Sequence, residues 1–119
     1  MLHMPRRVEK PWGFEVWWAE TEQYLGKILH VDEGKKISWQ YHNIKDETMH
    51  CLRGEAILIH EDEHGIIHED VLPIGQSFRI KPGTKHRLKG GIGGCDVLEA
   101  STPQSEDVVR LEDDYGRIT

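Results

Sequence analysis

The chain has 119 residues, the size of one ordinary domain, and 30% of them are charged, with a net charge of −6. This acidic balance argues against nucleic acid or an anionic membrane as the main partner, and no apolar run is long enough to span a bilayer. The N-terminus lacks the apolar stretch of a signal peptide, and two cysteines, Cys51 and Cys95, make no disulfide framework. We therefore expect one soluble domain, residues 1–119, in a reducing cytoplasm.

Short apolar or alternating runs follow one another along the chain, and turn residues separate them. They predict strands at 14–18, 24–31, 37–42, 48–52, 56–60, 66–72, 77–80, 86–88 and 97–101. The acidic segment 61–65 predicts a hairpin loop, the glycine-rich segment 90–94 predicts a mobile connection between strands, and no segment before Thr102 has a helical period. Many short strands at this spacing predict an all-β antiparallel sandwich or barrel.

Four polar side chains with metal-binding chemistry lie at or near the ends of these strands. Gln40 and His42 are two residues apart in one predicted strand, so they face the same side. Glu47 begins the next strand, and His86 follows a Pro-Gly turn at the head of a returning strand. Three strand segments could thus converge on one point. Two imidazoles, one carboxylate and one amide oxygen would suit one divalent transition metal ion: Zn, Mn, Fe, Co or Ni.

A structural alternative exists for the same four residues. His42 and His86 could be ordinary polar residues at a barrel mouth, hydrogen-bonded to Glu47 and Gln40. The amide oxygen of Gln40 is also a poor ligand for Zn or Ni. The joint spacing of all four side chains within a frame of glycines favours the metal site.

Two spaced frames carry a resemblance to a known family. The first is Gly34, Gln40-Tyr41-His42, Glu47 and Gly54, and the second is Gly75, Lys81-Pro82-Gly83 and His86. They resemble the paired motifs of the cupins, small β-barrels with an interior metal, most of which have histidine at the position of Gln40. The resemblance implies a single cupin-type (jelly-roll) antiparallel β-barrel with a short C-terminal extension.

The glutamine form of the first frame is similar to the type II mannose-6-phosphate isomerase domain, which is often fused to a mannose-1-phosphate guanylyltransferase. Further similarity to that domain lies at 10–13, 34–42, 82–88, 106–110 and 112–117. The resemblance implies a metal-dependent aldose–ketose isomerase that acts on a sugar phosphate. Asn43, Ile44 and Lys45 stand where that domain usually has two further histidines and an arginine.

An isomerase of this kind needs a base that carries a proton between adjacent carbons. Lys45, with a pKa lowered by burial and a nearby cation, is one candidate, and a hydroxide on the metal is another. Arg117 is a second catalytic candidate. Arg110, Lys85 and Arg87 are candidates for binding the substrate phosphate, for which guanidinium groups are well shaped. Arg110 and Arg117 could instead pair with the acids of the C-terminal segment.

Two further functions fit the same fold. The first is a non-catalytic module that binds carbohydrate or another small ligand, with tryptophans stacked on sugar rings. The second is an iron-dependent oxygenase, which Gln40 in place of a histidine makes less favoured. A small molecule, such as a sugar or sugar phosphate, is the expected ligand of the isomerase and of the binding module. A homodimer is expected by analogy with the fold.

Overall fold

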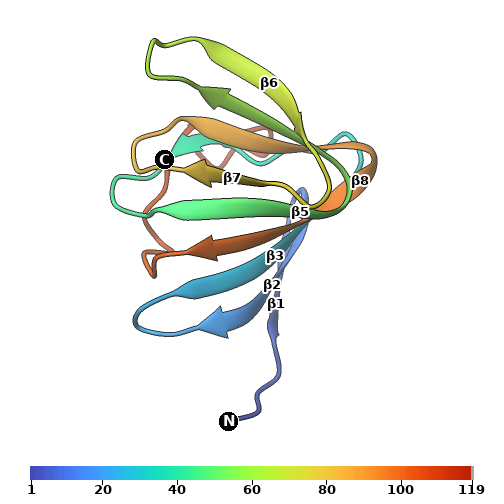
Figure 1. The fold of residues 1–119 in the computed structure, drawn as a ribbon, viewed down its shortest axis with the longest axis vertical. Helices are drawn as coiled ribbons and strands as arrows, with labels where there is room; N and C mark the ends of the chain where they lie inside the picture. The colour runs from blue at the N-terminus through green and yellow to red at the C-terminus, as the bar shows by residue number, and fades with distance from the viewer. Residues whose placement is uncertain (119) are drawn as a thin grey trace.

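The computed structural model describes residues 1–118. Within these residues, every assigned element is a β-strand (Figure 1). The strands are β1 (Arg6–Lys10), β2 (Gly13–Glu20), β3 (Leu25–Val31), β4 (Trp39–Tyr41), β5 (Glu47–Glu61), β6 (Ile67–Leu72), β7 (Ser77–Ile80), β8 (His86–Ser101) and β9 (Val109–Glu112). Within this part of the chain, no helix is long and apolar enough to cross a membrane. The predicted all-β antiparallel class is confirmed.

The strands form one continuous antiparallel sheet that curls back on itself, and β5 and β8 run through both of its halves (Figure 1). The start of β5 lies between β7 and the end of β8. On its other side, the end of β8 pairs with β3, which is followed in the sheet by β2 and then β1. The end of β5 pairs with β6 and with the start of β8, which continues to β4 and β9. The two halves enclose the interior in which His42, Glu47 and His86 lie.

Glycines make the bends of β5 and β8 possible. Gly54 has a φ of +80°, and a Cβ there would lie 2.2 Å from the Gly94 carbonyl oxygen. A Cβ on Gly90 would lie 2.5 Å from the Asp32 carbonyl oxygen. The segment 90–94 was predicted as a connection between two strands, but it lies inside the single strand β8. Its glycines permit close backbone approach at a sharp bend.

Other boundaries also differ from prediction. The runs at 48–52 and 56–60 belong to the one strand β5, because the chain bends near Gly54 without leaving the ladder. The predicted strand 77–80 has the observed bounds. The charged strand β1 was missed because it is an edge strand with mostly exposed side chains. The short strand β9, in the C-terminal extension, was missed as well, and it pairs with β4.

Alternation of inward and outward side chains builds the apolar core. Its fully or nearly buried members are Trp12, Leu29, Val31, Ile37, Met49, Cys51, Ala56, Leu58, Leu72, Ile80, Leu88, Cys95 and Val97. Cys51 and Cys95 are buried free thiols, and burial raises the pKa of both, that of Cys95 to about 12. Neither thiol is therefore suited to nucleophilic chemistry.

Candidate metal centre

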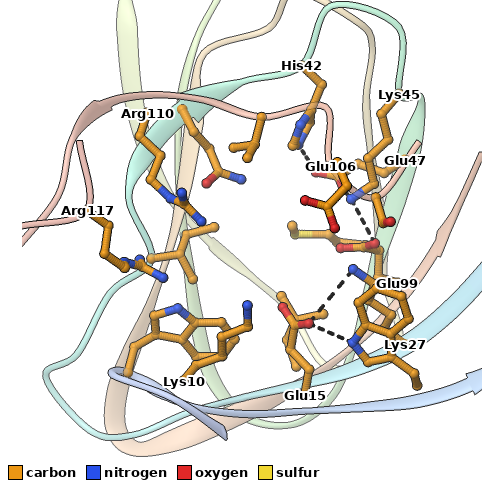
Figure 2. Close-up of a pocket in the computed structure, with 18 residues that line it drawn as sticks. Lys10, Glu15, Lys27, His42, Lys45, Glu47, Glu99, Glu106, Arg110 and Arg117 are labelled. Carbon is orange, nitrogen blue, oxygen red and sulfur yellow. Dashed lines mark hydrogen bonds and ion pairs between the residues drawn. The ribbon is translucent and has the colours of Figure 1, made fainter. Parts of the chain in front are cut away.

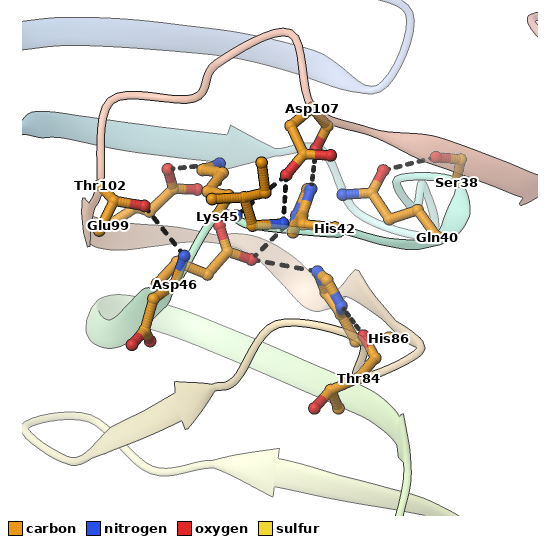
Figure 3. A network of polar contacts seen from close by, with 12 residues as sticks. Ser38, Gln40, His42, Lys45, Asp46, Thr84, His86, Glu99, Thr102 and Asp107 are labelled. Atoms are coloured by element: carbon orange, nitrogen blue, oxygen red, sulfur yellow. Dashed lines mark hydrogen bonds and ion pairs between the residues drawn. The ribbon is translucent and has the colours of Figure 1, made fainter.

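Three side chains from separate parts of the chain meet inside the barrel (Figure 3). His42 follows β4, Glu47 begins β5 and His86 begins β8. Their exposed fractions are 4%, 2% and 0%, and one possible ligand atom from each lies within 4.8 Å of the others. Glu47 Oε1 is 3.5 Å from His42 Nε2 and 3.1 Å from His86 Nε2. These three side chains therefore converge on one point.

Backbone carbonyls fix the orientation of both imidazoles. His42 Nδ1 is 2.5 Å from the Asp107 carbonyl oxygen, and His86 Nδ1 is 2.8 Å from that of Thr84. A carbonyl oxygen only accepts, so each Nδ1 carries a hydrogen and each Nε2 faces Glu47. At that position Nε2 can offer either a proton to the carboxylate or a lone pair to a metal.

The converging atoms lack partners of their own. His42 Nε2, His86 Nε2 and Glu47 Oε1 are all buried without a hydrogen bond among the described residues. Two lone pairs that face a carboxylate oxygen are unfavourable unless protons or a cation lie among them. One divalent cation would satisfy all three atoms at once, and two nitrogens with one oxygen form a donor set that transition metals accept. The residues present fit a metal ion.

Gln40 lies beside this group, but its amide oxygen is already used. Gln40 Oε1 accepts a hydrogen bond of 2.6 Å from Ser38 Oγ, and its amide nitrogen points toward the His42 side (Figure 3). Gln40 could offer oxygen to a metal only after the amide turns over. The Ser38 hydroxyl can donate or accept, so it would support either orientation.

Lys45 links Glu47 to a second buried carboxylate. Lys45 Nζ is 3.0 Å from Glu47 Oε2 and 3.1 Å from Glu99 Oε2. Burial acts to lower the pKa of Lys45, but Glu99 and Glu47 together outweigh it and raise the pKa above its ordinary value. The two flanking carboxylates, which the sequence did not reveal, therefore oppose the lowered pKa that we expected from burial and a nearby cation.

The two carboxylates respond to burial in opposite directions. Burial acts to raise the pKa of Glu47, yet the facing imidazoles and Lys45 hold it well below its usual range. Burial and the charge of Glu47 raise the pKa of Glu99. Adjacent carboxylates whose pKa values are pushed apart can divide the tasks of ligand and proton carrier.

Glu99 and its neighbours were not singled out in the sequence. Glu99 shares the inward parity of Val97, and Lys27 shares that of Leu29. Lys27 Nζ lies 3.8 Å from Glu15 Oε1 and 3.9 Å from the centre of the Trp17 ring, and burial lowers its pKa. Charged residues at inward positions of otherwise apolar strands were the signal that could have found them.

A cavity of about 210 Å³ opens beside the metal-facing group (Figure 2). Glu47, Lys45 and Glu99 lie on one side, and Arg110 and Arg117 point into it from the other. The cavity therefore has a carboxylate-rich side and a guanidinium-rich side.

The two arginines differ in how their charges are balanced. Arg117 makes two side-chain hydrogen bonds of 2.9 Å to Asp113. Arg110 has no ion pair within residues 1–118, and its Nε is buried without a hydrogen-bond partner there. The pairing expected as an alternative thus holds for Arg117. Arg110 points its guanidinium into the cavity without a contact ion pair in the described residues, although its charge helps to lower the pKa of Asp113.

Lys85 and Arg87 lie away from this cavity. Lys85 Nζ is 3.7 Å from Glu61 Oε2 and lines a separate surface hollow. Arg87 donates from Nε to the Ile37 carbonyl oxygen at 3.0 Å, and its other nitrogens lie 3.8 to 3.9 Å from acids of the C-terminal segment. His86 points inward, so the adjacent Arg87 of β8 points to the opposite face of the sheet, and Lys85 precedes the strand. The structure does not bring Lys85 and Arg87 together with His42.

The curled antiparallel barrel and the interior His/Glu/His group define a cupin. The fold matches that of oxalate decarboxylase from Bacillus subtilis with a TM-score of 0.79 at 15% identity, over 90% of this chain and 30% of that one. It matches KdgF from Halomonas sp. with a TM-score of 0.71 at 18% identity, over 87% and 91%. The chain belongs to the family described as mannose-6-phosphate isomerase C-terminal, whose model matches residues 1–113.

Curated relatives agree with this assignment. Mannose-1-phosphate guanylyltransferase ManC of Salmonella typhimurium is 32% identical over 98% of this chain and 24% of its own length. D-lyxose ketol-isomerase of Cohnella laeviribosi is 32% identical over 53% of this chain and 43% of its own length. The chain spans about a quarter of ManC. The family predicted from the sequence is confirmed, whereas the homodimer and the cytoplasmic location stay predictions.

Proposed function

We propose that the protein is a metal-dependent aldose–ketose isomerase that acts on a sugar phosphate, with mannose 6-phosphate and fructose 6-phosphate as the pair to test first. The observation that carries this proposal is one cavity with converging Nε2 and carboxylate atoms on one side and the unpaired Arg110 on the other. A family described as an isomerase domain and a ketol-isomerase among the relatives support it.

His42, Glu47 and His86 would hold the metal, with Gln40 beside them. A bound divalent cation polarises the carbonyl and hydroxyl oxygens of a sugar and stabilises the negative charge that develops when a carbon-bound proton is removed. The three ligand candidates are buried and oriented, so this chemistry would need little rearrangement of the protein.

Arg110 is suited to bind the phosphate. It is the cavity-facing guanidinium without an acidic partner in the described part of the chain, and a phosphate dianion would supply the missing charge. Arg117, held in place by Asp113, and Lys10 also line this side of the cavity. A substrate could therefore place its phosphate on this side and its reacting carbons toward Glu47.

Glu99 and Lys45 are suited to carry the proton. Glu99 lines the cavity and its pKa is raised, so it can accept a proton from one sugar carbon and return it to the adjacent one. Lys45 keeps its proton between Glu47 and Glu99 and would stabilise the carboxylate form of Glu99. This assignment gives Lys45 the role of a charge partner in catalysis, with Glu99 as the base.

A coupled assay of mannose 6-phosphate and fructose 6-phosphate interconversion tests the proposal. We expect activity that disappears when a chelator removes the metal and returns on addition of Mn²⁺, Co²⁺ or Zn²⁺. Glu99→Gln should lose most activity and keep its metal. A folded, metal-loaded protein without turnover would contradict the isomerase assignment.

A non-catalytic sugar-binding module remains the second candidate, because Trp12 and Trp17 line the same cavity. It predicts that a sugar or sugar phosphate raises the melting temperature without being converted. The oxygenase alternative predicts oxygen consumption by the iron-loaded protein, and it rests on the fold alone.

A further inference from the structure

Asp107 contacts the segment that carries His42 with both its backbone and its side chain (Figure 3). Its carbonyl oxygen lies 2.5 Å from His42 Nδ1. Its carboxylate accepts hydrogen bonds from three successive backbone N–H groups: Asn43 at 3.1 Å, Ile44 at 2.7 Å and Lys45 at 2.9 Å. One residue therefore sets the orientation of the imidazole and also holds the backbone that follows it.

The segment between β4 and β5 needs such support from outside. Residues 42–46 lie outside the strands. His42 begins this segment, and Glu47 follows it as the first residue of β5. The N–H groups of residues 43–45 have no ladder partner, and the carboxylate of Asp107 supplies one for each. These donors, that of Lys45 first, lower the pKa of the Asp107 carboxyl to about 2, so the carboxylate stays ionised at neutral pH.

The chain after β8 forms a strap, residues 102–112, that is anchored on both sides of Asp107. Thr102 exchanges two hydrogen bonds of 3.0 Å with the backbone of Asp46. Beyond Asp107, β9 pairs with β4, with Val109 opposite Tyr41 and Arg110 opposite Gln40. The strap thus lies along the metal-facing segment from Gln40 to Asp46, and contacts with Asp46 and with β4 fix it on both sides of Asp107.

We propose that Asp107 is a positioning residue for the metal, one that holds His42 Nε2 on the Glu47–His86 pair although Asp107 itself is no ligand. The inference rests on the proposed metal site. Partners that orient a ligating histidine from behind commonly change metal affinity by about 10–100-fold. Because binding is reciprocal, a metal should in turn strengthen the contact between the strap and residues 43–45.

Titration of chelator-treated protein with Co²⁺ alone tests the proposal, with Asp107→Ala as the variant. The matched control is Asp113→Ala, which removes another carboxylate of the C-terminal segment that accepts from a backbone N–H, that of Arg117, but does not touch residues 42–47. Asp107→Ala removes the carboxylate that holds residues 43–45 and keeps the carbonyl group that faces His42 Nδ1. We therefore expect a Co²⁺ dissociation constant raised about 10-fold for Asp107→Ala, the lower end of the effect of outer partners, and changed less than about 2-fold for Asp113→Ala. Wild-type affinity in a folded Asp107→Ala protein, or an equal loss in both variants, would overturn the inference.

Amide exchange of the wild-type protein gives a second readout that does not depend on the variant folding. Addition of Co²⁺ should slow hydrogen exchange at the amides of residues 43–45 and along the strap, and leave the hairpin between β5 and β6 unchanged. Unchanged exchange at residues 43–45 in protein that has bound Co²⁺ would contradict the reciprocal coupling. A wild-type protein that binds no Co²⁺ would overturn both the inference and the metal site, whereas metal binding without turnover would affect only the isomerase assignment.

Discussion

The two sides of the cavity show opposite ways of handling charge (Figure 2). On the side of Glu47, the charged groups are buried and paired. The buried atoms without a hydrogen bond there are the two imidazole Nε2 atoms and Glu47 Oε1, which could bind a cation. On the side of Arg110, the group without a hydrogen-bond partner is a guanidinium, which could bind an anion. A cavity with these two complementary deficits is suited to a ligand that is anionic at one end and oxygen-rich at the other. Each prediction below breaks one side and leaves the other intact.

The largest effect is expected when the side of Glu47, which would bind the metal cation, loses a ligand candidate. His86→Ala should lose stoichiometric metal and lower the isomerase rate more than about 100-fold, because direct ligation exceeds the effect of outer partners. His68→Ala is the matched control, since His68 pairs with Asp62 on the β6 hairpin, far along the chain from the site. Elemental analysis and the coupled assay check both variants. Full metal content in His86→Ala would show that the ion binds elsewhere.

Removing the buried lysine should reveal how strongly the carboxylates repel one another. Lys45→Met would leave Glu47 and Glu99 buried without the ammonium group between them, at a cost of about 3–5 kcal/mol in the free energy of unfolding of the metal-free protein. Lys85 is half-exposed, so Lys85→Met should change the free energy of unfolding by less than about 0.5 kcal/mol. Urea denaturation of chelated samples measures both. Metal should stabilise Lys45→Met more than wild type, and equal stabilisation would contradict this account of the network.

On the side of Arg110, which would bind the phosphate, Arg110→Met should weaken recognition of phosphate and leave metal content unchanged. Loss of one charge-assisted contact of about 1.5–3 kcal/mol corresponds to a fall of about 10–100-fold in kcat/KM for the phosphorylated sugar. The unphosphorylated sugar is the internal control, since its kcat/KM should change little. An equal fall for both sugars would place Arg110 in the chemical step or in folding, away from phosphate recognition.

The smallest effect is a pH dependence at Asp107. Its pKa is lowered to about 2 from an ordinary value of about 4, so its contribution to stability is full above about pH 4 and is lost as pH falls through about 2. Asp107→Asn lacks this titration. In chelated samples, the difference in unfolding free energy between wild type and variant should be constant from about pH 7 to 5 and shrink between about pH 4 and 2. A difference that is constant over the whole range would refute the assigned pKa.

Strand parity predicted the inner geometry well, because alternation is a local property of the backbone. The same alternation, applied strictly, would have excluded Arg87 from the cavity, since His86 points inward. Charges that only meet through tertiary contacts were harder to predict. The partners of Lys45 come from β5 and β8, and the cap on residues 43–45 comes from Asp107, more than sixty residues later. The spacing of the motif residues contains no record of these contacts.

The bends were unpredictable for a similar reason. Gly54 and the glycines at 90–94 look like breaks between strands, yet they allow two strands to continue through a fold of the sheet. Composition alone does not distinguish a glycine that ends a strand from one that lets a neighbouring carbonyl approach.

Incubation of the metal-loaded protein with mannose 6-phosphate in D₂O, followed by NMR, tests the central claim most directly. The account predicts formation of fructose 6-phosphate, with deuterium on the receiving carbon in the turnovers in which Glu99 exchanges its proton with solvent, and no product after chelation. Folded, metal-loaded protein that gives neither product nor deuterium exchange would contradict it.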